Sequence, residues 1–215
     1  MEKKTDLMAA IAECLVQGQA PKVKELTEAA IREGVSLHRI LNGGLVAGMA
    51  VIGERFKKEE IYLPEVLFAA RAMKAGMDVL EPLLAAAGVK PVAKMVLGTV
   101  KGDIHDIGKN LVGVMMRGAG FEVIDIGIDA PPEKFVAAVR QHRARLVGMS
   151  ALTGMTMPAM KTTVEAFDAA GLRGQVKIMV GGAIVTQSYA NSIGADGYAP
   201  DAALAVDKAK QLLGG

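Results

Sequence analysis

Residues 92–215 alternate between short apolar runs and helix-forming stretches, and this alternation constrains the fold more than any other feature. Helical patterns begin near Asp106, Pro131, Met157, Thr186 and Asp201, and the runs between them are VAKMVLGTV, FEVIDIG, RLVGMS, VKIMVGG and DGYA. Continuous apolar strands that alternate with helices are typical of a parallel sheet covered on both faces. The pattern therefore predicts a five-stranded parallel sheet with flanking helices. Ligands of such sheets bind at the carboxyl ends of the strands.

The first part of the chain has a different composition. It holds eight of the 25 glycines in residues 1–90, and apolar residues recur there at helical spacing. We expect helices over residues 5–17, 21–34, 36–56 and 64–87, followed by the linker AAAGVKP, in which a glycine and a proline end the last helix. The predicted fold is an N-terminal helical bundle cap, residues 1–88, followed by a Rossmann-like (flavodoxin-like) α/β domain, residues 92–215.

Composition excludes several classes of function. The formal net charge is only +2, aromatic residues make up 4% and tryptophan is absent, so we expect no nucleic-acid partner. No apolar run reaches 18 residues and the N-terminus does not resemble a signal peptide, so we expect no membrane partner and a cytoplasmic location. Cys14 is the only cysteine, which excludes an internal disulfide and a cysteine metal cluster.

The first predicted strand of the α/β domain ends in the stretch GTVKGDIHDIGKN, residues 98–110. Its spacing fits neither a P-loop nor a dinucleotide fingerprint, and two aspartates would repel a phosphate. His38 and His142 lack ligand spacing to His105, so a conventional zinc site is not expected. Taken alone, His105 could be a loop histidine bonded to Asp103. It could also be the one axial ligand of a metal that a tetrapyrrole-type macrocycle already holds.

Three motifs together carry a resemblance. Asp103-x-His105-x-x-Gly108, then Ser150-x-Leu152, then 181–182 (Gly-Gly), is similar to the D-x-H-x-x-G, S-x-L and G-G pattern of cobalamin-binding domains. Residues 41–77 resemble the helical cap of methionine synthase and of methyltransferase corrinoid proteins. The best match is a stand-alone corrinoid protein of a system that serves methylamines, methanol or methoxylated aromatics.

The resemblance implies a set of cofactor-binding residues. Cobalamin would bind base-off and His-on, with His105 as the cobalt ligand, Asp103 accepting from its imidazole, and Thr156 completing a proton-relay triad. Thr156 is equally placed to cap the helix that follows it. Small residues at Gly98, Gly108, Ser150, Gly181 and Gly182 would leave a slot for the nucleotide tail. Further contacts are expected from Gly102, Ile104, Asp106, Leu152, Thr153, Gly154 and Ala202.

One position departs from the family pattern. Relatives commonly carry a hydroxyl four residues after the serine, facing the nucleotide, and this chain has Gly154 there. Either Thr153 substitutes for it or one hydrogen bond is missing. In the cap, the resemblance places Phe56 and Leu63 over the cobalt-bound methyl group, with Val66 nearby and Asn42 at the ring's edge. Helical periodicity alone favours a core role for Phe56 and Leu63.

The implied function is that of a methyl carrier. Cob(I)alamin would accept a methyl group from a substrate-specific methyltransferase and donate it to a second methyltransferase that uses tetrahydrofolate or a thiol, with a reductive activase as a further partner. The cap would then have to move away for transfer, with residues 88–91 as the hinge. A mutase cobalamin subunit and a cobalamin-dependent sensor remain as alternatives. The residues show no separate constellation for substrate catalysis.

Overall fold

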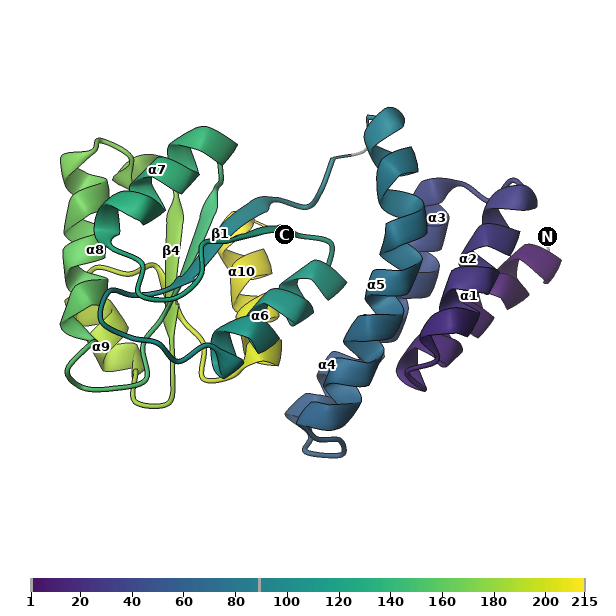
Figure 1. The fold of residues 1–215 in the computed structure, drawn as a ribbon, viewed down its shortest axis with the longest axis horizontal. Helices are drawn as coiled ribbons and strands as arrows, with labels where there is room; N and C mark the ends of the chain where they lie inside the picture. Colours follow the sequence, from purple (N-terminus) through teal and green to yellow (C-terminus); the bar gives the residue numbers. More distant parts are fainter. Residues whose placement is uncertain (1, 89, 215) are drawn as a thin grey trace. The chain divides into compact units, whose positions relative to one another are not determined.

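The computed structural model describes residues 2–88 and 90–214, without the side chains of residues 2–6 and 85. The chain divides into a helical unit that ends at Lys90 and an α/β unit that begins at Pro91. No helix among the described residues is both long and apolar enough to cross a membrane. The fold class agrees with the prediction from the sequence: helices first, then a parallel sheet with helices around it (Figure 1).

The helical unit consists of α1 (Glu2–Val16), α2 (Ala20–Arg32), α3 (Leu37–Ile40), the π-helix η1 (Leu41–Val46), α4 (Ala47–Lys57) and α5 (Leu63–Ala86). Ser36 caps α3 as its position suggests, because its hydroxyl accepts a hydrogen bond from the Arg39 amide at 3.4 Å. The predicted helix over 36–56 is thus three consecutive helical segments. The first helix begins at Glu2, so Thr5 lies within it and does not start it.

The strands of the α/β unit form one five-stranded, all-parallel sheet in the order β2-β1-β3-β4-β5 among the described residues. They are β1 (Lys94–Thr99), β2 (Glu122–Asp125), β3 (Leu146–Ser150), β4 (Lys177–Gly181) and β5 (Gly197–Tyr198). Thr99 pairs with Ser150, and Ser150 pairs with Gly181. Three strands therefore end at the same level, and the loops that follow them meet at one edge of the sheet.

Helices cover both faces of this sheet. Figure 1 shows α7, α8 and α9 on one side of it and α6 and α10 on the other. The helices are α6 (Ile107–Gly118), α7 (Pro132–His142), α8 (Pro158–Ala169), α9 (Gln187–Ser192) and α10 (Ala202–Leu213), with the 3₁₀ turn η2 (Arg173–Gln175) before β4.

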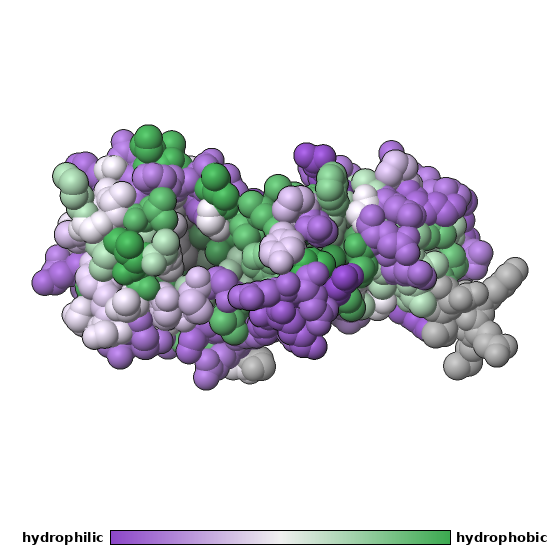
Figure 2. Space-filling model, turned by 90° about the horizontal axis from the view of Figure 1, so that it is seen from below, coloured by the Kyte–Doolittle hydropathy of each residue, from purple (hydrophilic) through white to green (hydrophobic). Residues whose placement is uncertain are grey.

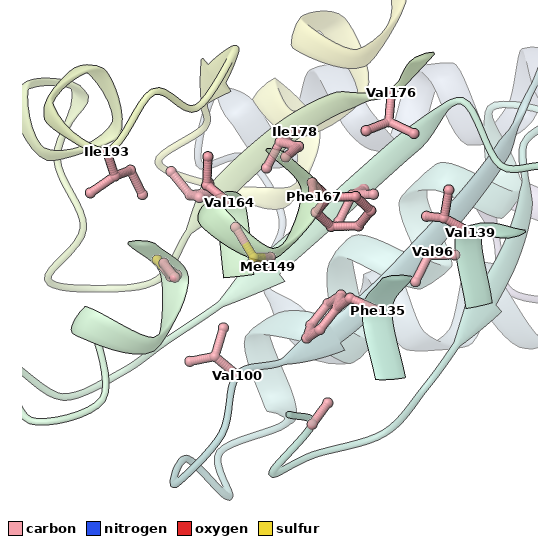
Figure 3. Packing of buried hydrophobic residues seen from close by; sticks show 14 of the residues in the cluster. Val96, Val100, Phe135, Val139, Met149, Val164, Phe167, Val176, Ile178 and Ile193 are labelled. Atoms are coloured by element: carbon pink, nitrogen blue, oxygen red, sulfur yellow. The ribbon is translucent and has the colours of Figure 1, made fainter. Parts of the chain in front are cut away.

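A large cluster of buried side chains lies between the sheet and α7–α9 (Figure 3). Val96 and Met149 point into it from the central strands, and Phe135 of α7 and Phe167 of α8 pack against them with no exposed surface. Neighbouring strand residues such as Met95 and Leu97 are also buried, on the opposite face. Burial on both faces explains the continuous apolar runs in the sequence, and it holds the strand ends rigidly.

Candidate functional site

The loop after β1, residues 100–106, begins with a tight turn. The Val100 amide donates to the Ser150 carbonyl at 3.0 Å, and the Asp103 amide donates back to the Val100 carbonyl at 3.1 Å. Gly102 has a φ of 84°, a left-handed conformation that favours glycine. The turn directs Asp103 inward, where its side chain has 1% exposure, and leaves His105 at the surface.

The Asp103 carboxylate accepts four hydrogen bonds, two on each oxygen. Oδ1 accepts from the His105 amide at 3.0 Å and from His105 Nδ1 at 2.8 Å. Oδ2 accepts from the Leu152 amide at 2.7 Å and from the Thr156 hydroxyl at 2.6 Å. A carboxylate offers about four lone-pair positions, so this group is saturated with donors. Two of these donors come from the loop after β3, which ties the two strand ends together.

Electrostatics keep Asp103 ionised. Burial alone would raise the pKa of its carboxyl group, because it disfavours the charge. The hydrogen bonds from Thr156, from the amides of Leu152 and His105 and from the His105 ring outweigh burial, and they hold the pKa well below its usual range.

The His105 ring is fixed at one nitrogen and open at the other. An ionised carboxylate can only accept, so Nδ1 carries the proton in the bond to Asp103, and Nε2 keeps its lone pair. The side chain is 51% exposed, so Nε2 can reach a ligand. The His105 carbonyl accepts a hydrogen bond from the buried Thr99 hydroxyl at 2.9 Å. A histidine held in this way is the arrangement expected of a metal ligand.

Thr156 lies where the triad prediction requires, but it does not cap a helix. Its hydroxyl donates to Asp103 and lies 3.0 Å from the Thr153 hydroxyl and 3.0 Å from the Thr153 carbonyl. Helix α8 starts at Pro158, and Met157 is its N-cap residue, without a side-chain cap. The capping role is therefore wrong, because Asp103 and Thr153 engage the hydroxyl. Thr153 extends the hydrogen-bonded chain from Asp103 by one more hydroxyl.

The glycines predicted to leave space behave differently from one another. A Cβ added at Gly108 or Gly154 would meet no atom within 4 Å, and one added at Gly181 would meet only the Ala199 carbonyl oxygen, at 3.1 Å. Open space therefore borders Gly108 and Gly154, whereas Gly181 is in close contact with the Ala199 carbonyl. Gly182 has a φ of 133°, and its backbone packs directly against the Ala151 carbonyl.

Gly98 differs from the prediction. A Cβ at this position would lie 2.6 Å from Ile126 Cγ1 and 2.9 Å from Phe135 Cζ. In this structure the missing side chain makes room for packing between β1, the segment after β2 and α7. Gly98 therefore does not leave an open slot.

Apolar side chains surround the histidine loop without being buried. Ile104 is 70% exposed, Ile107 72% and Met155 93%, and further apolar side chains at the same strand ends are also exposed: Ile128, Leu152 and Ile184. Figure 2 shows apolar patches interrupting the hydrophilic surface of the α/β unit on the face seen from below. Such a rim is suited to a large, flat, partly apolar ligand.

The remaining predicted residues have more varied surroundings. Asp106 is exposed and accepts from the Asn110 side chain at 3.0 Å, while Ala202 is buried in the first turn of α10. In the helical unit, Asn42 is exposed in η1 and donates to the His38 carbonyl at 3.1 Å.

Three predicted cap residues lie in α4 and α5. Phe56 and Leu63 are half-buried, and Val66 is fully buried and presents no surface to a ligand. A position over the cofactor stays a prediction for Phe56 and Leu63.

Sequence reasoning missed Thr99 and Asp129. Thr99 holds the His105 carbonyl, and Asp129, in the segment after β2, accepts from the Gly102 amide at 2.7 Å. It also missed the buried Lys109, whose ammonium group pairs with Asp125. Polar residues at strand ends were the available signal, because the strand ends share one edge of the sheet.

The donor set fits a metal that brings its own macrocycle. Within the described residues no three side chains of histidine, cysteine, aspartate or glutamate gather in a way that could hold a bare ion. What the site offers is one imidazole with a fixed tautomer, an apolar rim, and open space beside Gly108 and Gly154. Cobalamin requires one protein ligand and room for its ring and tail, so the residues present fit it.

Comparison with known families gives two matches. One B12 binding domain family matches residues 93–207, which is more than half of the chain. A second B12 binding domain family matches residues 7–81, within the helical unit.

Individual proteins are similar along nearly the whole chain. Dimethylamine corrinoid protein 3 of Methanosarcina acetivorans is 42% identical over 207 residues, covering 96% of this chain and 97% of that protein. A novel cobalamin-binding protein from Desulfitobacterium hafniense DCB-2 has a crystal structure with a TM-score of 0.78 and 31% identity, over 95% of this chain and 97% of that one. The methanol:cobalamin methyltransferase complex MtaBC from Methanosarcina barkeri matches with a TM-score of 0.86 and 30% identity, over 98% of this chain and 80% of that one.

Proposed function

The chain belongs to the B12-binding protein family, and on that premise we propose that it is a corrinoid protein that carries a methyl group between two methyltransferases. The single observation that carries the proposal is the His105 imidazole, oriented by the saturated Asp103 carboxylate and open at Nε2. The similarity to dimethylamine corrinoid protein 3 and to the methanol:cobalamin methyltransferase complex supports the methyl-carrier role. None of these relatives favours a mutase subunit or a sensor.

When bound, cobalamin supplies a cobalt centre that accepts and releases a methyl group. In this proposal His105 Nε2 would hold the cobalt, which is the base-off and His-on mode of binding. Asp103 holds the ring in the tautomer that leaves Nε2 free, and it raises the basicity of the imidazole by accepting from Nδ1. Thr156, with Thr153 beside it, keeps the second carboxylate oxygen in place.

The open space beside Gly108 and Gly154 is the place we assign to the detached nucleotide tail, with Gly181 at its border. Phe56 and Leu63 of the helical unit are assigned to the position over the cobalt-bound methyl group, and Asn42 to the ring's edge. The cap movement described above for transfer, with residues 88–91 as the hinge, belongs to the same proposal.

Partners follow from the carrier role. A substrate-specific methyltransferase supplies the methyl group, a second methyltransferase that uses tetrahydrofolate or a thiol removes it, and a reductive activase restores the lowest cobalt oxidation state. The similarity to a dimethylamine corrinoid protein makes methylamines the first donor class to test, with methanol second. A cytoplasmic location is part of the same proposal.

The ligand is tested by electron paramagnetic resonance of the protein reconstituted with cobalamin and reduced to Co(II). We expect nitrogen superhyperfine splitting from one protein imidazole. Labelling the protein with ¹⁵N-histidine should change this splitting, which identifies the nitrogen as that of a histidine. His105→Ala should abolish it, and His142→Ala, which removes a histidine at the end of α7, should leave it intact. A wild-type spectrum without imidazole splitting would refute His105 as the ligand.

The carrier role is tested with the methyl donor. The protein in its lowest cobalt oxidation state is mixed with a methylamine methyltransferase and its amine, and methylation is followed by absorbance. Methanol with its own methyltransferase is the parallel arm. Stoichiometric methylation in either arm supports the proposal. A protein that holds cobalamin but is methylated by no partner methyltransferase of the family would contradict it.

A further inference from the structure

The segment between β2 and α7, residues 126–131, contacts the end of β1 and the first half of the histidine loop. The Thr99 amide donates to the Gly127 carbonyl at 3.0 Å, and the Ala130 amide donates to the Thr99 carbonyl at 2.9 Å. Ala130 also forms a parallel bridge with Val100. The segment, called here the brace, therefore follows the backbone of β1 into the loop that carries His105.

Asp129 makes the two contacts of the brace that lie nearest to the histidine. Its carboxylate oxygen Oδ1 accepts from the Gly102 amide at 2.7 Å. Its own amide donates to the Asp103 carbonyl at 2.9 Å. One residue thus binds two consecutive residues of the loop, the second of which lies two positions before His105.

The backbone of Asp129 adopts the left-handed conformation, with a φ of 47°. This region is unfavourable for most residues, and aspartate tolerates it better than they do. The surrounding contacts hold Asp129 in this conformation, from which its amide and its carboxylate both reach the loop. A residue kept in a sparsely populated conformation is a reason to look for a function there.

At Gly102 and Asp103 the loop backbone is held from outside by Asp129, whereas the Asp103 side chain is held by Leu152 and Thr156. Within the described residues the hydrogen bond recorded for the Gly102 amide is the one to Asp129, and the Asp103 amide closes the turn on Val100. Further along the loop, the Thr99 hydroxyl donates a hydrogen bond to the His105 carbonyl. Asp129 therefore supports the backbone at Gly102 and Asp103, and Thr99 supports it at His105.

We infer that Asp129 is a positioning residue for His105. It orders the turn at Gly102 and Asp103 before any ligand arrives, so that Nε2 already points where an axial ligand is needed. The inference rests on the proposed role of His105 as the cobalt ligand. Ordering the loop in advance removes a cost that binding would otherwise carry.

Three substitutions separate the hydrogen bond from the backbone conformation. Asp129→Gly removes the acceptor and accommodates a positive φ without strain. Asp129→Asn keeps an acceptor oxygen and tolerates the same conformation. Arg143→Gly is the matched control, because Arg143 also has a left-handed backbone, with a φ of 53°, at the end of α7. Asp129 is exposed, so its substitutions leave the core intact.

The first measurement is hydrogen exchange of the Gly102 amide in the cofactor-free protein. Loss of a hydrogen bond to a charged acceptor should speed its exchange about ten- to hundredfold in Asp129→Gly. Asp129→Asn should stay within about threefold of wild type, and Arg143→Gly should match wild type. Unchanged exchange in Asp129→Gly would overturn the inference, and so would equally fast exchange in Asp129→Asn.

The second measurement is the fraction of Co(II) protein that shows imidazole splitting. We expect Asp129→Gly to lose at least half of the His-on fraction, and Asp129→Asn and Arg143→Gly to keep it. A full His-on fraction in Asp129→Gly would show that the brace orders the loop without positioning His105, and would overturn the inference. If the wild-type protein itself shows no imidazole splitting, the result contradicts His105 as the cobalt ligand and not the role of Asp129. Failure of the proposed ligand and failure of the Asp129 inference are therefore distinguishable.

Discussion

Asp103→Asn is the substitution for which the structure makes the sharpest prediction. An amide has nearly the shape of a carboxylate, but it replaces one acceptor oxygen with a donor. If the amide nitrogen takes the Oδ1 position, it faces the His105 amide; if it takes the Oδ2 position, it faces the Leu152 amide. The Thr156 hydroxyl can rotate and the imidazole can change tautomer, but a backbone amide can only donate. Either orientation therefore leaves one buried N–H without an acceptor.

The expected cost follows from these bonds. A buried donor without a partner costs roughly 1–3 kcal/mol, and hydrogen bonds to a charged group exceed neutral ones by about 1 kcal/mol each. With two bonds weakened and one donor unsatisfied, Asp103→Asn should lower the free energy of unfolding of the α/β unit by about 3–5 kcal/mol. Thr156→Val removes one donor and leaves the carboxylate three, so we expect a loss of about 1–2 kcal/mol.

The assay is urea unfolding of the cofactor-free protein, read by hydrogen exchange at the β1 amides so that the α/β unit is measured by itself. Asp106→Asn is the matched control, because Asp106 is an exposed carboxylate in the same loop, and its change should stay within about 0.5 kcal/mol. If Asp103→Asn and Asp106→Asn shifted the stability equally, the saturated carboxylate would not organise the site as argued.

Four further predictions concern other positions. Gly108→Ala should stabilise the cofactor-free protein by up to ~1 kcal/mol, because a Cβ at this position in α6 meets open space. The same substitution should lower the corrinoid affinity measured by equilibrium dialysis, and an unchanged affinity would show that the nucleotide tail does not bind beside Gly108. Gly98→Ala should destabilise the cofactor-free protein by about 1–3 kcal/mol in urea, because its Cβ would collide with Ile126 and Phe135; a neutral result would show that the two can move apart. Burial raises the pKa of the Tyr189 hydroxyl, so its contribution to stability is present below the ordinary pKa of ~10 and is lost as pH rises above it. Urea unfolding midpoints measured between pH 8 and 11 should therefore fall more steeply for wild type than for Tyr189→Phe. Parallel curves for the two proteins would contradict this. Phe56→Ala should speed photolysis of the methyl–cobalt bond at nearly unchanged corrinoid affinity, and an unchanged rate would remove Phe56 from the upper face.

The sequence predicts the sheet well because each strand is buried on both faces and therefore appears as a continuous apolar run. It predicts the Asp103–His105 contact because the two residues lie two positions apart in one loop. The position of Thr156 came from the family pattern, since 53 residues separate it from Asp103 and no local signal joins them. The capping prediction failed because Asp103 and Thr153 engage this hydroxyl and Met157, not Thr156, is the N-cap residue of α8.

Other parts of the site depend on contacts that no local pattern encodes. Gly98 looks like a residue that leaves a slot, but only the three-dimensional packing shows Ile126 and Phe135 in that space. Asp129 reaches Gly102 across 27 residues, and its left-handed backbone has no sequence signature beyond the residue type. The π-helix η1 within the predicted helix over 36–56 changes the hydrogen-bond spacing while the apolar pattern continues.

The register of β1 against β3 has a consequence for synthesis of the chain. Two of the four donors to Asp103 come from residues 49 and 53 positions later in the chain. When β1 and the histidine loop have just left the ribosome, the Asp103 carboxylate therefore has only two of its four hydrogen-bond donors. At roughly 5–20 residues per second, the second pair of donors follows some 3–10 seconds later. Cofactor loading during translation would therefore meet an immature pocket. Truncations that stop before Thr156 should retain His105 in the polypeptide and still fail to capture a corrinoid.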